Sequence, residues 1–349
     1  MIIAVCLGIL FVIILGVLFI FTMRSFHNFK YSSQGIPNTP DYYTNPSKLS
    51  LYKTDIAGLT IEHVTGDYLN GFRIIPDNIK YKGVIVTFGG SDGTPAYEQA
   101  IQLAQEGYQV LALFFFGMPN QHPTLAEVPV EYYQEIESYI SQHFSQPDMI
   151  TVIGTSKGAE YALLLASLYD SIDNVVLYAP SSHIYAGLDF RNYSSSWSQN
   201  GKALPYLDVR SENSLKLFYN FLIKTPISYY HTYKQALDKD KNSEDKRIKV
   251  EKTKANILIF AGENDRMWPS AESARLIEKY QPNHTQVTIY KEAGHLFAGD
   301  GIVDSRGIYL SVGGNKAANE TAKKDSDQRL KKQLSIWHSY CNFRLIKII

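Results

Sequence analysis

The fold is decided by the stretch Ile150-Thr151-Val152-Ile153-Gly154-Thr155-Ser156-Lys157-Gly158-Ala159. Its first four residues are apolar or β-branched and predict a short buried strand, and residues 157–168 have the composition of a helix. Between them lies the pattern G-x-S-x-G. A strand, a tight turn and a helix form the context in which this pattern presents a serine hydroxyl for nucleophilic attack. Ser156 is therefore a candidate nucleophile.

A second match to the same pattern, Gly89-Gly90-Ser91-Asp92-Gly93, follows an earlier apolar run at 84–88. Its position separates it from Ser156, because the first parallel strand of an α/β-hydrolase sheet leads into an oxyanion-hole loop and the third leads to the nucleophile. We expect the oxyanion hole to use the backbone N–H groups of Gly90, Ser91 and Lys157. The Lys157 side chain is expected to be a surface cation, with contact to an anionic substrate as the alternative.

The partners of a nucleophilic serine follow in the order Ser, Asp, His that α/β-hydrolases use. The apolar strand at 256–260 leads into an acidic loop that contains Asp265, and the strand at 286–290 leads to His295. A histidine would take the proton of Ser156, and a buried carboxylate would orient the imidazole. Asp265 is the predicted acid, and Glu263 and Asp300 are its competitors.

Further apolar runs extend this pattern over the chain and predict an α/β-hydrolase fold with an eight-stranded, mostly parallel sheet. Continuous apolar strands that alternate with amphipathic helices indicate a sheet covered by helices on both faces. The segment at about 181–250 is too long for an ordinary connection, so we expect an inserted cap there. The expected strands are 59–64 and 69–75, which form a hairpin, then 84–88, 110–116, 149–153, 174–178, 256–260 and 286–290.

The N-terminus carries a long apolar run, because no charged residue occurs in positions 1–23. That length is enough to cross about 30 Å of hydrocarbon, so we predict a single transmembrane helix at 1–23, with a cleaved signal peptide as the alternative. Residues 24–58 are predicted to be a linker and 59–349 the hydrolase domain. Arg24 and Lys30 follow the apolar run, which favours a cytoplasmic catalytic domain.

The composition excludes several function classes. Of the 349 residues, 45% are hydrophobic and 19% are charged, and 34 basic residues balance 34 acidic ones. A neutral chain without a basic stripe lacks the charge distribution of a nucleic-acid-binding protein. Two cysteines, Cys6 and Cys341, cannot build a cysteine zinc site, and neither a metal nor a cofactor is expected. The oligomeric state stays open.

Several of these segments together resemble the C-terminal catalytic domain shared by acyl-CoA thioesterases and bile acid-CoA:amino acid N-acyltransferase. The resemblance extends from about residue 82 to 345 and includes the cap. The segments that carry it are Gly154 to Glu160, Ser195-Ser196-Trp197 with Gly201-Lys202-Ala203-Leu204-Pro205, Ala261 to Ser270, Ala293-Gly294-His295-Leu296, and Gly313-Gly314-Asn315 with Ala317.

This resemblance implies attack of the nucleophile on an acyl thioester, an acyl-enzyme, and transfer of the acyl group to water or an amine. The nucleophile is serine, as in the thioesterases, whereas the conjugating acyltransferase uses cysteine, so hydrolysis is the expected outcome. Residues 24–80 leave no room for the large N-terminal β-sandwich domain of the mammalian members. The histidine loop also differs, because Phe297-Ala298-Gly299-Asp300 replaces the family's acidic, proline-rich stretch.

The function predicted from these observations is that of a membrane-anchored serine hydrolase that cleaves acyl thioesters through an acyl-enzyme. The expected partners are a small acyl thioester or ester and the membrane. Alternatives are a carboxylesterase, a dienelactone hydrolase-like enzyme, a serine peptidase, an acyltransferase to an amine, and a non-catalytic scaffold that kept the fold.

Overall fold

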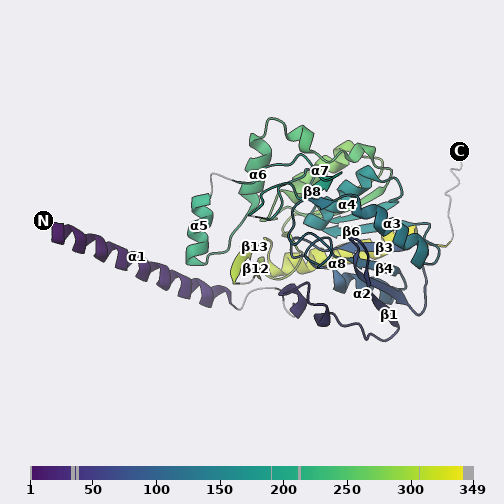
Figure 1. Cartoon of the computed structure of the whole chain (residues 1–349), viewed down its shortest axis with the longest axis horizontal. Helices are drawn as coiled ribbons and strands as arrows, with labels where there is room; N and C mark the ends of the chain where they lie inside the picture. The colour runs from purple at the N-terminus through teal and green to yellow at the C-terminus, as the bar shows by residue number, and fades with distance from the viewer. Residues whose placement is uncertain are drawn as a thin grey trace.

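The structure is a computed structural model that describes residues 2–32, 36, 39–189, 191–210, 214–305 and 307–340. Figure 1 shows one long helix, α1 (Ile2–Tyr31), projecting from a body that is built around a large sheet. Cys341 and the expected end of the family resemblance near residue 345 lie outside the described residues.

The sheet contains eight strands in the order β1-β2-β4-β3-β6-β7-β10-β11. Strand β2 pairs antiparallel with β1 and with β4, and the remaining pairs are parallel, which confirms the predicted mostly parallel sheet. The strand bounds are β1 Leu59–Thr65, β2 Asn70–Pro76, β3 Val84–Phe88, β4 Gln109–Leu113, β6 Ile150–Thr155, β7 Asn174–Tyr178, β10 Asn256–Gly262 and β11 Thr285–Tyr290.

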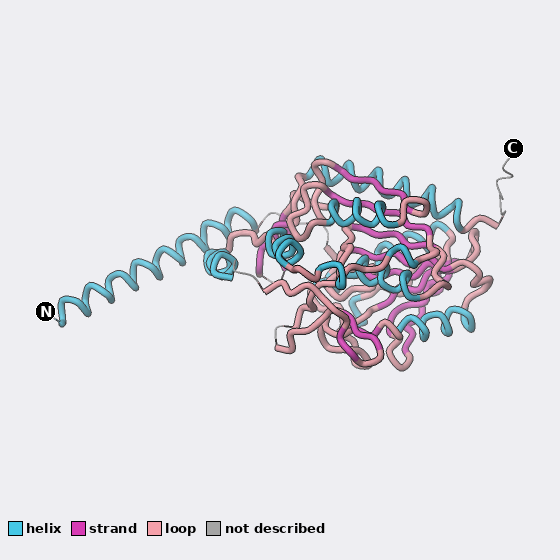
Figure 2. The backbone as a smooth tube through the Cα atoms, turned by 90° about the horizontal axis from the view of Figure 1, so that it is seen from above, coloured by secondary structure: helices cyan, strands magenta, loops and turns pink. Residues whose placement is uncertain are grey.

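Helices cover both faces of this sheet, as Figure 2 shows. One face packs against α3 (Tyr132–His143), α4 (Lys157–Leu168) and α7 (Ser270–Tyr280), and the other against α2 (Tyr97–Glu106) and α8 (Lys316–Trp337). Successive strand residues alternate between the two apolar cores, because side chains along a strand point to opposite faces. In β3, for example, Val84 and Val86 belong to the first core and Ile85 to the second.

The segment expected to be a linker, residues 24–58, differs from that expectation in two places. Helix α1 continues to Tyr31, well past the predicted end at residue 23. Two short 3₁₀ helices, Asp41–Tyr43 and Leu49–Leu51, then lead onto the α2 side of the sheet. There Tyr42 and Tyr52 are buried and stack with ring centroids 4.4 Å apart. The apolar area of two buried tyrosines holds this segment on the core.

The long connection between β7 and β10 contains the whole predicted cap region, residues 181–250. It includes β8 (Trp197–Gln199), β9 (Lys202–Ala203), α5 (Ser214–Ile223) and α6 (Tyr230–Lys239), followed by the 3₁₀ helices Ser243–Lys246 and Val250–Lys252. Strand β8 also pairs with β5 (Val128–Pro129), so this insertion is joined to the body before α3. A separate hairpin, β12 (Ile302–Ser305) and β13 (Ile308–Ser311), follows the histidine loop.

Candidate active site

The nucleophile candidate lies on a strained turn between β6 and α4. Ser156 has φ 55° and ψ −119°, a conformation that L-residues rarely adopt. A Cβ added to Gly158 would lie 1.9 Å from the carbonyl oxygen of Gly89, and one added to Gly154 would lie 2.2 Å from the carbonyl oxygen of Gly158. Both positions must be glycine, because backbone atoms occupy the space that a side chain would need. The turn thus holds the serine at the carboxyl edge of the sheet.

The structure brings Ser156, His295 and Asp265 into one hydrogen-bonded chain. His295 Nε2 lies 2.9 Å from Ser156 Oγ, and His295 Nδ1 lies 2.7 Å from Asp265 Oδ2. Both His295 and Asp265 are buried. A neutral imidazole that donates from Nδ1 to the carboxylate leaves Nε2 free to accept the serine proton. The arrangement has the geometry that general-base activation of a serine requires.

The carboxylate of Asp265 is held by three donors from its own loop. Its oxygens accept hydrogen bonds from the backbone N–H of Met267 at 2.7 Å and of Trp268 at 3.2 Å, and from Ser270 Oγ at 2.6 Å. These bonds compensate the burial of a charged group and orient it towards His295. Sequence reasoning had not assigned Ser270 to the site, although Ser270 lies within a segment that resembles the family.

The two competing acids are placed elsewhere. Glu263 forms an ion pair with Arg275 in which both side chains are substantially exposed. Asp300 makes no hydrogen bond to His295 in the described part of the chain, and one of its buried oxygens has no partner there. Of the three acids considered, Asp265 is the one that contacts the imidazole.

The loop expected to supply the oxyanion hole lies against Ser156. A Cβ added to Gly90 would lie 3.4 Å from Ser156 Cβ. The backbone N–H of Gly90 donates to Asp92 Oδ2 at 3.2 Å, so this donor is already engaged. Within the described ranges, no protein acceptor is found for the backbone N–H of Ser91 or Lys157. These two groups are therefore the available donors near Ser156.

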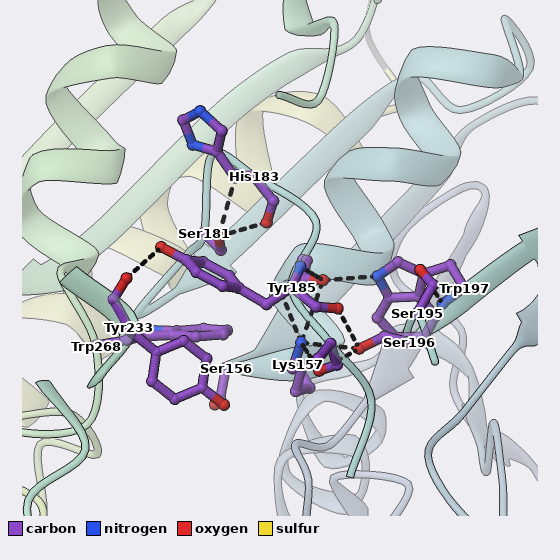
Figure 3. Close-up of polar contacts among 12 residues, drawn as sticks. Ser156, Lys157, Ser181, His183, Tyr185, Ser195, Ser196, Trp197, Tyr233 and Trp268 are labelled. Carbon is purple, nitrogen blue, oxygen red and sulfur yellow. Dashed lines mark hydrogen bonds and ion pairs between the residues drawn. The ribbon is translucent and has the colours of Figure 1, made fainter. Parts of the chain in front are cut away.

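The expectation that the Lys157 side chain is a surface cation is wrong. Lys157 is 2% exposed, and Nζ donates to Glu160 Oε2 at 3.0 Å and to Ser196 Oγ at 2.8 Å, with the carbonyl oxygen of Ala186 at 3.3 Å (Figure 3). The alternative of an anionic substrate contact also has no support, because the ammonium group is fully engaged by the protein. Burial lowers the pKa of Lys157 and raises the pKa of Glu160.

Glu160 completes this buried network. Its Oε1 accepts from Trp197 Nε1 at 2.8 Å and from the backbone N–H of Tyr185 at 3.2 Å (Figure 3). Lys157 and Glu160 belong to the first turn of α4, whereas Tyr185 and Trp197 belong to the insertion. The ion pair therefore connects the insertion to the helix that follows Ser156.

Aromatic side chains form a wall beside His295. The ring of Trp268 lies 5.8 Å from His295 in an edge-to-face arrangement, and its Nε1 donates to the carbonyl oxygen of Ala179. Tyr185 stacks on Trp268 at 6.1 Å, and Tyr233 meets it edge-on at 5.6 Å. Such rings are rigid and largely apolar. They limit the positions that the His295 imidazole can take.

A cavity of about 400 Å³ opens on the α2 and α8 side of His295. Its wall combines apolar groups, including Tyr178 and Phe297, with the charged side chains of Glu98 and Lys323. Desolvation raises the pKa of Glu98. The volume falls in the range of small-molecule sites, and the contact with His295 connects it to the triad geometry.

No metal site accompanies these residues in the described ranges, where no three His, Cys, Asp or Glu side chains are grouped to hold an ion. The hydrogen-bonded chain of serine, imidazole and carboxylate can activate a nucleophile without one.

With this geometry in place, comparison with known proteins gives a consistent result. Residues 128–299 match the family model described as BAAT / Acyl-CoA thioester hydrolase C terminal. The chain is similar to that family over these residues. The predicted resemblance is thereby confirmed, and the matched residues include Ser156, Asp265 and His295 but not the loop with Gly90 and Ser91.

The curated proteins that match this chain are distant relatives. Human acyl-coenzyme A thioesterase 6 is 24% identical over 280 residues, which are 76% of this chain and 62% of the relative. Mouse acyl-coenzyme A amino acid N-acyltransferase 1 is 27% identical over 247 residues, which are 68% of this chain and 54% of the relative. The chain thus spans less than two thirds of the length of these relatives.

Solved structures confirm the fold class. Carboxyl esterase 2 from the fungus Tuber melanosporum superposes with a TM-score of 0.52 at 14% identity, covering 90% of this chain and 98% of the esterase. At this identity the likeness concerns the fold alone. The chain, like this esterase, therefore has the α/β-hydrolase fold that the sequence predicted.

Proposed function

We propose that the protein is a membrane-anchored serine hydrolase that cleaves acyl thioesters, with Ser156 as nucleophile, His295 as base and Asp265 as the orienting acid. The observation that carries the proposal is the hydrogen-bonded chain from Ser156 Oγ through both nitrogens of His295 to Asp265. Three groups from the carboxyl ends of different strands meet at hydrogen-bonding distance, and serine hydrolysis uses this arrangement.

In the proposed reaction, Ser156 Oγ attacks the carbonyl carbon of the acyl thioester while His295 Nε2 takes the hydroxyl proton. The backbone N–H groups of Ser91 and Lys157 donate to the oxyanion of the tetrahedral intermediate. The carbon–sulfur bond then breaks, and the imidazolium returns its proton to the leaving thiolate. His295 next deprotonates a water molecule, which attacks the acyl-enzyme and releases the carboxylic acid and free Ser156.

Support for a thioester substrate comes from the similarity to the acyl-CoA thioester hydrolase family and from the two relatives, which are an acyl-coenzyme A thioesterase and an acyl-coenzyme A amino acid N-acyltransferase. We favour water as acceptor because a serine acyl-enzyme is an oxygen ester, which is less reactive towards amines than a thioester.

The proposed anchor is α1. Among the described residues it is the one helix long and apolar enough to cross a bilayer. A signal sequence has the same properties. Its uncharged part, residues 2–23, would span about 33 Å at 1.5 Å per residue, close to the hydrocarbon thickness. Arg24 and Lys30 follow it, so we place the catalytic domain on the cytoplasmic side.

The experiment that tests the catalytic proposal uses the full chain in detergent micelles. A fluorophosphonate probe should label the wild type and Ser91→Ala but not Ser156→Ala, and the first two proteins should release free thiol from acyl-CoA. Absence of labelling in the wild type would contradict an activated serine.

The same assay separates the alternatives. A labelled enzyme that cleaves simple esters but releases no thiol from any acyl-CoA would be a carboxylesterase. Formation of an N-acyl amino acid when glycine is added would identify an acyltransferase.

A further inference from the structure

We propose that α5 is an interfacial membrane helix, whose exposed apolar face lies in the surface of the same bilayer that α1 crosses. The proposal rests on the membrane anchor proposed above and adds a second point of contact, made by the insertion that also carries Tyr185 and Trp197. The occupant of this face is lipid.

The face consists of large apolar side chains exposed to solvent. Leu215 is 81% exposed, Phe218 58% and Tyr219 49%, and these positions follow the i, i+3, i+4 spacing that places them on one side of a helix. Phe221 adds a further exposed ring beside them. A helix that shows several such side chains together to water is a recognition surface, because single exposed apolar residues are common but contiguous ones are not.

The position of α5 is tied to the end of the apolar run of α1. Arg24 Nη1 donates to the carbonyl oxygen of Leu222 at 3.1 Å, and His27 Nδ1 lies 2.6 Å from the carbonyl oxygen of Ile223. Arg24 is the first charged residue of the chain, so these contacts place the last turn of α5 where α1 would leave the hydrocarbon. The depth of α5 is thereby set at the membrane interface.

The orientation of α5 also fits a helix lying on the membrane. In Figure 1, α5 runs across α1 rather than along it, and Figure 2, turned by 90°, shows α5 nearly end-on beside the last part of α1. If α1 crosses the bilayer, α5 therefore lies close to the plane of its surface. Interfacial helices adopt this orientation, with the apolar face directed into the boundary between headgroups and acyl chains.

The residues around the contact between α1 and α5 also have the charge and aromatic content that suit a lipid surface. Residues 2–40 and 214–229 contain no acidic residue, whereas Arg24, Lys30, Lys216 and Lys224 are basic. Basic side chains at this level attract anionic headgroups. The last turns of α1 add exposed phenylalanines at 26 and 29, and aromatic rings are enriched at membrane interfaces. Charge and aromatic content both favour lipid over a soluble partner.

The segment after α5 is hydrogen-bonded to the loop that contains Asp265. After α5, Ser228 Oγ and the backbone N–H of Tyr230 both donate to the carbonyl oxygen of Arg266, at 2.7 and 3.0 Å. Arg266 directly follows Asp265. A bilayer that holds α5 therefore holds the insertion close to the acid loop, at the surface into which long acyl chains partition.

The test measures the depth of spin labels on the full chain in liposomes of phosphatidylcholine and phosphatidylglycerol. In a background with Cys6 and Cys341 replaced by serine, labels are attached at Leu215→Cys and Phe218→Cys. Leu10→Cys in α1 reports the anchor, and Lys202→Cys on the exposed β9 is the matched surface control. Power saturation compares collisions with oxygen, which concentrates in lipid, and with a water-soluble nickel chelate. Fluorophosphonate labelling of Ser156 checks that each variant is folded.

We expect the ratio of oxygen to nickel accessibility to exceed one at 215, 218 and 10, and to fall below one at 202. Nickel accessibility at 215 and 218, with position 10 in lipid, would overturn the proposal while leaving the anchor intact. Protection from both reagents would also overturn it, because the face would then be covered by a second copy or another protein. Nickel accessibility at position 10 would instead reject the anchor itself.

Discussion

Replacement of Lys157 by methionine should destabilise the folded chain by about 3 kcal/mol, because it leaves the Glu160 carboxylate buried without its cation. Lys157 is 2% exposed and Glu160 is fully buried, so water cannot replace the lost ammonium group. Glu160 would keep its donors from Trp197 and from the backbone of Tyr185. Methionine has nearly the same length and is apolar, which keeps the loss of packing small.

The size of this loss in stability is limited by protonation of Glu160 in the variant. Glu160 can bind a proton in the folded state, and burial already raises its pKa. In the unfolded chain Glu160 has its ordinary pKa of 4.5, which lies 2.5 units below pH 7. Protonating the carboxylate at pH 7 therefore costs about 3 kcal/mol, at 1.36 kcal/mol per unit. Glu160→Gln should cost a comparable amount by leaving Lys157 unpaired. The double variant should cost clearly less than the sum of the two single ones.

Urea unfolding of the full chain in detergent, followed by near-ultraviolet circular dichroism, would measure these free energies. The control is Lys331→Met, which removes the surface ion pair with Glu106, where both side chains are partly exposed and the expected loss is below about 1 kcal/mol. If Lys157→Met costs no more than this control, or if the two single variants are additive, the buried pair does not fasten the insertion to α4 as described.

Three further outcomes are expected. Ser156→Ala should lower kcat by about 10⁴-fold or more, while Ser91→Ala, which keeps its main chain, should change thiol release from acyl-CoA little. Gly158→Ala should destabilise the chain by about 2 kcal/mol or more in urea titrations, because its Cβ would meet the Gly89 carbonyl at 1.9 Å. Burial lowers the pKa of His338 to about 4 in the folded chain, from an ordinary value of 6.5. The contribution of the neutral imidazole to the free energy of unfolding is therefore complete above pH 6.5 and is lost as the pH falls towards 4. His338→Asn should therefore show a weaker loss between these pH values, by up to about 3 kcal/mol, in unfolding measured at a series of pH values.

The order of the strands along the chain and the candidate residues at their ends could be predicted from local patterns. Strands such as β3 and β6 are buried on both faces, so their residues form continuous apolar runs that are readable in the sequence. In a parallel sheet the carboxyl ends of neighbouring strands meet at one edge. Ser156, Asp265 and His295 each follow a strand, and this common edge is why they could be grouped without coordinates.

The groups that surround the candidate site could not be predicted in the same way. The hydroxyl of Ser196 that binds Lys157 lies 39 residues away along the chain, and the carbonyl of Ala186 lies 29 residues away. Nothing in the periodicity of α4 distinguishes a lysine covered by a distant loop from one exposed to water. Its burial depends on the insertion folding back over the helix.

The N-terminal part of the chain shows the same difference between what local patterns predict and what distant contacts decide. The uncharged run of residues 2–23 was evident from composition, but the packing of Tyr42 on Tyr52 and the contacts of Arg24 and His27 with the end of α5 were not. The sequence by itself determined where strands, helices and the catalytic candidates lie along the chain, because those features follow from periodicity within a few residues. Only the tertiary structure decided which polar groups are buried together and which apolar helix face stays exposed, because both depend on contacts between segments far apart in the chain.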